Sequence, residues 1–214
     1  MAIKPILFNT EMVRAILDGR KGATRRIVKG FIPDDAVWGY TAFTPKGYIS
    51  CRGTFADGYK GIFFKLPCES GDILYVRETW KKAPNGYYYY EDWQKDDIAD
   101  VTKWKPSIHM PKEAARIWLK VIDVRVERLQ EITAESALTE GADKYIHANG
   151  TLNEDQTITS FIGIWNSTIK ESDLDRYGWD ANPYVWVISF ERCAKPVESP
   201  YAWNDAIHKL TKGV

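Results

Sequence analysis

The sequence predicts an α+β barrel in one domain, and three observations support this fold class. The chain has 214 residues, of which 44% are hydrophobic and 27% are charged, which is the balance of a globular protein rather than a disordered one. Short runs of branched and aromatic residues, typical of strands, are mixed with only a few stretches of helical periodicity. Neither an internal repeat nor a low-complexity linker divides the chain, so we expect a single domain over residues 1–214.

The N-terminal elements follow from local signals. Residues 3–8 read as a short strand, and Asn9 or Thr10 is suited to cap a helix whose apolar residues share one face. Gly19 supplies the C-terminal stop of this helix. Residues 24–29 form the second expected strand.

The next part of the chain is predicted to hold hairpins and insertions. Residues 30–68 are rich in Gly, Pro and Tyr, and we expect a hairpin with loops there. Its turn signals are Pro33-Asp34, Pro45-Lys46-Gly47 and Asp57-Gly58. Residues 72–80 read as one strong strand, and an Asn85-Gly86 turn follows it. The run from Tyr87 to Tyr90 is expected to alternate between faces, which leaves both edge packing and base stacking open for these rings.

Residues 115–128 are the longest strand candidate, with a break of register at Ile122-Asp123 that predicts a β-bulge. Thr133 is expected to cap a short helix that runs through Glu140 and stops at Gly141. The remaining expected elements are a helix over residues 157–169, a last strand over residues 184–193 and a terminal helix over residues 201–211.

Charge is balanced over the whole chain but unevenly distributed. The 29 basic residues equal the 29 acidic ones, which excludes a uniformly basic nucleic-acid coat. Residues 20–29 hold five basic residues and no acid, whereas residues 131–180 hold ten acids and three bases. A local basic patch can bind phosphate whatever the net charge, although a solvated face would show the same pattern.

Cysteine, histidine and hydropathy patterns point to a cytoplasmic protein without a cofactor. The three cysteines form no CxxC pair, which favours a reduced compartment over a disulfide framework. The three histidines are far apart and no metal-ligand spacing appears, so we expect neither a metal nor another cofactor. No signal-peptide pattern and no apolar run of roughly 18 residues is present, and we expect no membrane partner.

The most informative run is LDGRKGATRR at residues 17–26. After the helix stop, Arg20 and Lys21 are expected on a turn that Gly22 allows to bend tightly, and Thr24 opens the next strand. One loop would then project an amine and a hydroxyl group. Taken alone, these residues are also compatible with a solvated turn lysine and an ordinary strand start.

Four segments in this order resemble the ASCH family, a branch of the PUA-like β-barrel superfamily linked to RNA. They are GRKxxTRR at 19–26, SGDILYVRETW at 70–80, ITAESALTEGA at 132–142 and YVWVISFERC at 184–193. The resemblance covers the chain except for insertions at about residues 30–68, 83–103 and 146–156. It implies a mixed β-barrel with short flanking helices. KPSIHMP at 105–111 and WDANPYVWVISF at 179–190 are most similar to a subgroup of phages and prophages, which implies the cytoplasm of a bacterial host.

Some ASCH members are amidohydrolases that remove the acyl group from N4-acetylcytidine. By resemblance, their catalytic Lys, Thr and Glu correspond to Lys21, Thr24 and Glu140. Thr24 would attack with Lys21 as its base and then as the acid, while Glu140 would activate water or hold the amine. Like charge on the neighbouring arginines is expected to lower the pKa of Lys21. Many relatives have Thr where this chain has Gly22, and the compact hydrolases lack the three insertions.

Seven further polar residues are the candidate substrate-binding residues: Arg20, Arg25, Arg26, Arg77, Glu78, Ser107 and His109. Arg77 and Glu78 are adjacent on a strand and therefore face opposite sides, so that one of them faces the barrel mouth. Ser107 and His109 are candidates for the border of a ligand pocket, although a buried, hydrogen-bonded histidine is the more common arrangement.

Three functions remain open at this level. The first is an amidohydrolase acting on N4-acylcytidine-like substrates. The second is a non-catalytic RNA- or DNA-binding module, or a metal-independent ribonuclease, of phage origin. The third is a phage morphogenesis or host-interaction protein that uses the Tyr-rich hairpin and the acidic insertion as its contact surface. The expected partner is a modified nucleoside or single-stranded RNA or DNA, and the oligomeric state is left open.

Overall fold

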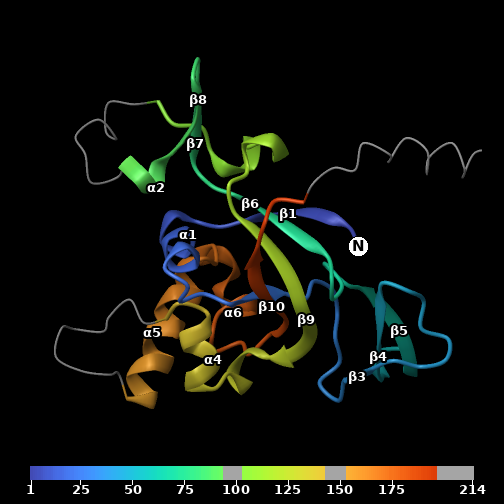
Figure 1. The fold of residues 1–214 in the computed structure, drawn as a ribbon. Helices are drawn as coiled ribbons and strands as arrows, with labels where there is room; N and C mark the ends of the chain where they lie inside the picture. Colours follow the sequence, from blue (N-terminus) through green and yellow to red (C-terminus); the bar gives the residue numbers. More distant parts are fainter. Residues whose placement is uncertain (94–102, 143–152, 197–214) are drawn as a thin grey trace, which may run out of the picture.

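The computed structural model describes residues 1–93, 103–142 and 153–196, and within these ranges the chain is a mixed α+β protein (Figure 1). The predicted α+β class is confirmed. The described strands form a five-stranded, a three-stranded and a two-stranded sheet. The terminal helix expected over residues 201–211 and most of the insertion at residues 146–156 lie outside the described residues.

The five-stranded sheet is the centre of the molecule. Its strands, in spatial order, are β1 (Ile3–Leu7), β6 (Ile73–Arg77), β9 (Trp118–Arg128), β10 (Tyr184–Cys193) and β2 (Ala23–Ile27). β1 pairs with β6 in parallel, and the other neighbours are antiparallel. β1 and β2 are the two edges, so backbone pairing among the described strands does not close this sheet into a barrel. A side chain links the edges instead, because Arg26 Nη2 donates to the Leu7 carbonyl at 3.0 Å.

Two short helices begin and end where the sequence predicts. In α1 (Thr10–Leu17), the Asn9 side chain accepts a hydrogen bond from the Met12 amide, and Gly19 follows with a φ of 76°. In α4 (Ala134–Thr139), Thr133 is the N-cap and Gly141 has a φ of 84°. Such left-handed positions favour glycine because it lacks a Cβ.

The longest described helix, α5 (Glu154–Ser167), begins three residues before the predicted start. Asn153 and Gln156 form a capping box there, in which each side chain accepts a hydrogen bond from the backbone amide of the other residue. The other described helices are short: α2 (Tyr90–Trp93), α6 (Leu174–Tyr177) and the 3-10 turns Ser107–His109, Lys112–Ala114, Leu129–Glu131 and Glu171–Asp173. None of the described helices is long and apolar enough to cross a membrane.

The predicted bulge in the long strand is confirmed. Along the β9–β10 pair, Asp123 is opposite Ser189 and Val121 is opposite Phe190, so Ile122 has no partner across the ladder. Ile122 is 47% exposed. The extra residue lets β9 keep apolar side chains on its buried face on both sides of the break.

The expectation of one strand over residues 72–80 is wrong. β6 ends at Arg77, and β7 (Trp80–Ala83) starts a separate hairpin with β8 (Gly86–Tyr89). The chain leaves the main sheet at Glu78, whose amide donates to the Met110 sulfur and whose carboxylate pairs with Arg116. These tertiary contacts override the apolar pattern that continues through Trp80.

The rings of the Tyr-rich run are used for packing. Tyr87 lies 5.8 Å from Trp80, Tyr88 lies 6.1 Å from Trp93 and Tyr90 lies 5.5 Å from Trp104, measured between ring centroids. The Tyr89 hydroxyl donates to the Ala114 carbonyl at 2.6 Å. Of the two roles left open for these residues, edge packing is the one that their contacts support.

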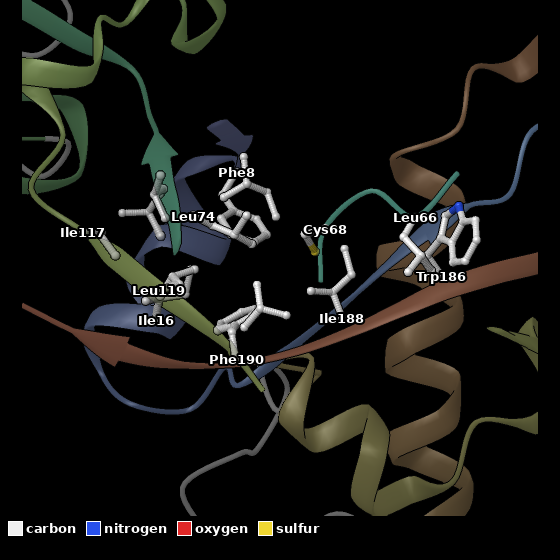
Figure 2. Packing of buried hydrophobic residues seen from close by; sticks show 14 of the residues in the cluster. Phe8, Ile16, Leu66, Cys68, Leu74, Ile117, Leu119, Trp186, Ile188 and Phe190 are labelled. Atoms are coloured by element: carbon white, nitrogen blue, oxygen red, sulfur yellow. The ribbon is translucent and has the colours of Figure 1, made fainter. Parts of the chain in front are cut away.

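Alternate residues of β10 face two different cores. Val185 and Val187 pack against α4 and α5, whereas Trp186, Ile188 and Phe190 face the core between the main sheet, α1 and the second sheet (Figure 2). Each fully buried side chain of this size contributes about 1.5–3 kcal/mol. β10 is therefore the element on which both halves of the structure depend.

The second sheet fills the segment 30–68, where a hairpin was predicted and is found. Its strands are β3 (Val37–Gly39), β4 (Tyr48–Phe55) and β5 (Gly58–Lys65), in that order. Trp38 attaches it to the main sheet, with its ring 5.1 Å from Phe64 and 6.3 Å from Trp186 between centroids. In Figure 1 this sheet and the helices α4 and α5 lie on either side of β9 and β10.

Candidate functional site

The Lys21 loop is fixed by backbone hydrogen bonds to three separate elements. The amides of Arg20 and Lys21 both donate to the Ala15 carbonyl of α1, at 2.8 and 3.0 Å. Gly22 donates to the Thr139 carbonyl and accepts from the Phe190 amide, each at 2.8 Å. These bonds hold Lys21 between α1, the end of α4 and β10. A Cβ at position 22 would lie 3.6 Å from the Phe190 oxygen, an ordinary contact, so space does not demand glycine there.

Lys21 and Glu140 form a buried pair. The Lys21 amine lies 3.0 Å from Glu140 Oε2 and donates to the Glu140 carbonyl at 2.9 Å. The Lys21 side chain is fully buried, and that of Glu140 is 8% exposed. Glu140 is the C-cap of α4, which directs both its carboxylate and its carbonyl toward the loop.

A second buried cation shares this carboxylate. Arg25 Nη1 lies 3.0 Å from Glu140 Oε1, and Arg25 Nη2 donates to Ser136 Oγ at 3.0 Å. The same guanidinium pairs with Glu127 on β9. Glu140 is therefore held between Lys21 and Arg25, which fixes its orientation.

The pKa of Lys21 is lowered from its ordinary value of 10.5, mainly because burial removes the ammonium group from water. The Glu140 carboxylate opposes this shift, and the charges of Arg26 and Arg25 add to it. The predicted direction is confirmed, but the main cause differs from the like-charge repulsion that the sequence suggested. The guanidinium of Arg20 lies 2.9 Å from Asp18.

Thr24 is buried but is held apart from the Lys21–Glu140 pair. Its hydroxyl lies 3.0 Å from Arg26 Nη1, and it faces the opposite side of β2 from Arg25 because side chains alternate along a strand. Among the described residues, no hydrogen bond joins Lys21 to Thr24. Phe8 contacts both sides of this arrangement. Its ring lies 5.6 Å from the Lys21 amine and 5.2 Å from the guanidinium carbon of Arg26, the residue that contacts Thr24.

A cavity of about 390 Å³, the helix-side cavity, borders Glu140. This volume is within the range of small-molecule sites. Arg20 and Gly141 contribute to its wall, whereas Lys21 and Thr24 do not. The lining residues come from α1, the Lys21 loop, the end of α4 and α5: Asn9, Glu11, Met12, Arg14, Ala15, Arg20, Glu140, Gly141, Ile164 and Ser167.

A second cavity, of about 310 Å³, lies between β1, β2 and β6, and we call it the cationic cavity. Its lining holds Lys4, Arg26 and Arg77 and no acidic residue; the others are Pro5, Ile6, Leu7, Pro67, Cys68, Leu74 and Ile188. Lys4 pairs with Asp72 at 3.2 Å, and Arg77 Nε donates to the Met110 carbonyl at 2.7 Å. Within the described ranges, neither Arg26 nor Arg77 is ion-paired with a carboxylate. The burial of Arg26 lowers the pKa of its guanidinium, which nearby Glu140 opposes.

The other predicted binding residues lie elsewhere. Glu78 is buried and pairs with Arg116 at 2.9 Å, so of the adjacent residues only Arg77 faces a cavity. Ser107 and His109 line neither of the two cavities. The alternative of a buried His109 is wrong, because this residue is exposed on a 3-10 turn and the following Met110 is the buried one.

Sequence reasoning missed Glu127, Ser136 and Phe8 as parts of this site. Arg25 and Glu127 meet because β2 and β9 both flank β10, and no local pattern reveals that strand order. Ser136 had a local signal, since it lies one helical turn before Glu140 and so on the same side of α4.

No group of three or more His, Cys, Asp or Glu side chains in the described part of the chain is placed to hold a metal ion. No protein-family model, curated protein or solved structure significantly matches the chain. Its site must therefore be interpreted from the arrangement of its own residues.

Proposed function

We propose that this protein is an ASCH-type amidohydrolase that removes the acyl group from an N4-acylated cytidine or a similar modified nucleoside. The observation that carries the proposal is the buried Lys21 amine, 3.0 Å from Glu140, at a carboxylate that lines a cavity of about 390 Å³. A PUA-like barrel is part of the same proposal. The hydrogen bond from Arg26 to Leu7 supports it, because it joins the two edges that a barrel would bring together.

The residues fit the proton transfers of amide hydrolysis. Glu140 reaches the cavity and takes a proton from a water molecule, whose oxygen attacks the acyl carbon. The bond from this carbon to N4 then breaks, and N4 receives a proton, which yields cytidine and a carboxylic acid. Lys21, hydrogen-bonded to Glu140 and with a lowered pKa, supplies or relays this proton. Thr24 lines neither of the two cavities and its hydroxyl accepts a hydrogen bond from Arg26, so we assign the attacking step to water.

The test is release of cytidine from N4-acetylcytidine by the purified protein, followed by chromatography. We expect Lys21→Ala and Glu140→Gln each to lower kcat/KM by about 100-fold or more. Arg125→Met is the matched control, because Arg125 is 46% exposed and belongs to the outer part of the same charge network. No cytidine release, or equal release by Lys21→Ala and the wild type, would contradict the proposal.

A second candidate is a non-catalytic module that binds RNA or DNA. The cationic cavity favours it, because Arg26 and Arg77 face it without a carboxylate partner among the described residues. Assays of the same purified protein distinguish the amidohydrolase from the binding module. Absence of cytidine release, together with nucleotide binding that Arg77→Met weakens, supports the module. The phage-type origin and the cytoplasm of a bacterial host belong to these proposals and depend on the resemblance alone.

A further inference from the structure

The second sheet has one face on the core and one face toward solvent. In an antiparallel pair, residues directly opposite each other point to the same side. Trp38, Cys51 and Ile62 are opposite one another and share the inner face with Phe64, whose ring packs on Trp38. The outer face carries the alternate residues: Val37, Gly39, Tyr48, Ser50, Arg52, Thr54, Tyr59, Gly61, Phe63 and Lys65.

This outer face displays aromatic rings to solvent. Tyr59 is 67% exposed and Phe63 is 45% exposed, and Val37, opposite Arg52 on β3, is 50% exposed. Five aromatic side chains among the described residues are largely exposed; Tyr59 and Phe63 lie on this face, and Phe31, Tyr40 and Phe43 lie elsewhere in the segment 31–63. Rings are normally buried because each removes a large apolar area from water, so a cluster of exposed ones points to a ligand.

The charge on this face is positive and unpaired. It carries Arg52 and Lys65 and no acid, and within the described ranges neither cation pairs with a carboxylate. Gly61 separates Tyr59 from Phe63 along β5, and Arg52 is directly opposite Gly61 on β4. The Arg52 side chain covers Gly61, because a Cβ at this glycine would be only 3.3 Å from Arg52 Cγ. Arg52 therefore lies between the two rings. An acid beside the end of the sheet, Asp35, accepts hydrogen bonds from the Thr54 amide and hydroxyl at 2.8 and 2.7 Å.

We propose that this outer face, with Tyr59, Arg52 and Phe63 at its centre, binds single-stranded nucleic acid. The rings would stack on bases, and Arg52 and Lys65 would contact phosphates. The positive charge of this face, which carries no acidic residue, favours a polyanionic strand as its occupant. The site is separate from the Lys21 loop, which lies with α4 on the other side of β10, and it does not depend on the proposed hydrolysis.

The test is fluorescence anisotropy with labelled single strands of about 12 nucleotides, one of uridines and one of thymidines, at about 50 mM salt. We expect Tyr59→Ala and Phe63→Ala each to weaken binding about 5-fold or more, and the double variant about 30-fold or more. Phe43→Ala is the matched control, because Phe43 is 87% exposed but lies in the loop outside this face. It should change the dissociation constant less than about twofold, and circular dichroism should show all variants folded.

Two further readouts test the charge and the location of the site. Arg52→Gln should reduce the slope of log affinity against log salt by about 0.7, the value for one phosphate contact on a single strand. Arg125→Met, which removes one exposed cation on β9 outside this face, should bind as the wild type does. The proposal is overturned by absence of binding, by equal binding of the Tyr59/Phe63 double variant and the wild type, or by an equal loss of binding in Arg125→Met and Arg52→Gln. It is also overturned if sedimentation shows a dimer that the double variant abolishes, because the face would then be a self-interface.

Discussion

Two buried ion-pair clusters in this protein are alike in composition but differ in what surrounds them. In the first, the Lys21 cluster, Glu140 is held by Lys21 and Arg25. In the second, the Glu78 cluster, Glu78 and Asp92 share Arg116, at 2.9 and 2.7 Å. The carboxylates at the centre of both clusters are removed from water, with side-chain exposures of 8% for Glu140 and 3% for Glu78.

The difference lies in charge balance and access. Around Glu140, cations outnumber carboxylates once Arg26 is included, and the helix-side cavity reaches the carboxylate. Around Glu78, carboxylates outnumber the single guanidinium, which lies 4.1 Å from the centre of the Tyr89 ring. Glu78 lines neither of the two cavities. Burial of an ion pair is therefore no guide to function by itself, and the Glu78 cluster serves to attach the β7–β8 hairpin and α2 to the start of β9.

The largest expected effect is on the stability of the Lys21 cluster. Glu140→Leu leaves Lys21 buried without a carboxylate, and we expect the free energy of unfolding to fall by about 3–5 kcal/mol. Lys21→Met should cost less than about 2 kcal/mol, because Glu140 keeps Arg25 and the methionine stem fills the same space. Urea unfolding of both variants measures the difference. Equal losses would show that Glu140 is not the residue that compensates the buried lysine.

Breaking the Glu78 cluster should cost stability but not activity. Arg116→Met leaves Glu78 without its cation, and we expect a loss of about 2–3 kcal/mol, because the partly exposed arginine leaves some room for water. Arg125→Met, which removes the ion pairs of an exposed arginine with Asp123 and Glu127, should cost less than about 1 kcal/mol. Both variants should retain the acyl release of the wild type. Loss of release in Arg116→Met at a temperature where it is folded would contradict the structural role of this cluster.

The smallest expected effects are opposite pH dependences. Burial raises the pKa of Glu78 above its ordinary 4.5. The favourable contribution of Glu78 to the free energy of unfolding is therefore present below pH 4.5 and is lost as pH rises through the raised pKa. The pKa of Lys21 is lowered, so its favourable contribution to the free energy of unfolding is present above pH 10.5 and is lost as pH falls through the lowered pKa. The stability difference between wild type and Glu78→Gln should therefore shrink from about pH 4 to pH 7. The stability difference between wild type and Lys21→Met should grow as pH rises toward 10.5.

Features set by a few neighbouring residues could be predicted from the sequence. The caps at Asn9 and Thr133, the stop at Gly141 and the bulge at Ile122 depend on backbone preferences within one turn or one ladder step. The pairing of Lys21 with Glu140 was expected only through the resemblance to a family, since 119 positions separate the two residues.

Features set by strand order could not be predicted. Arg25 meets Glu127 only because β10 lies between β2 and β9. The strand break at Glu78 depends on Arg116 and on the Met110 sulfur, which are distant in sequence. The apolar alternation through Trp80 therefore predicted a strand that these contacts prevent.

The position of β10 between β9 and β2 also sets the timing of folding during synthesis. β2 (Ala23–Ile27) pairs with no other described strand, so it has no ladder partner until β10 (Tyr184–Cys193) leaves the ribosome. At roughly 5–20 residues per second, that interval is about 8–30 s. During the same interval the Lys21 loop lacks the hydrogen bond that the Phe190 amide donates to the Gly22 carbonyl. A nascent chain that stalls before β10 therefore lacks the strand pairing that positions the basic loop in the finished protein.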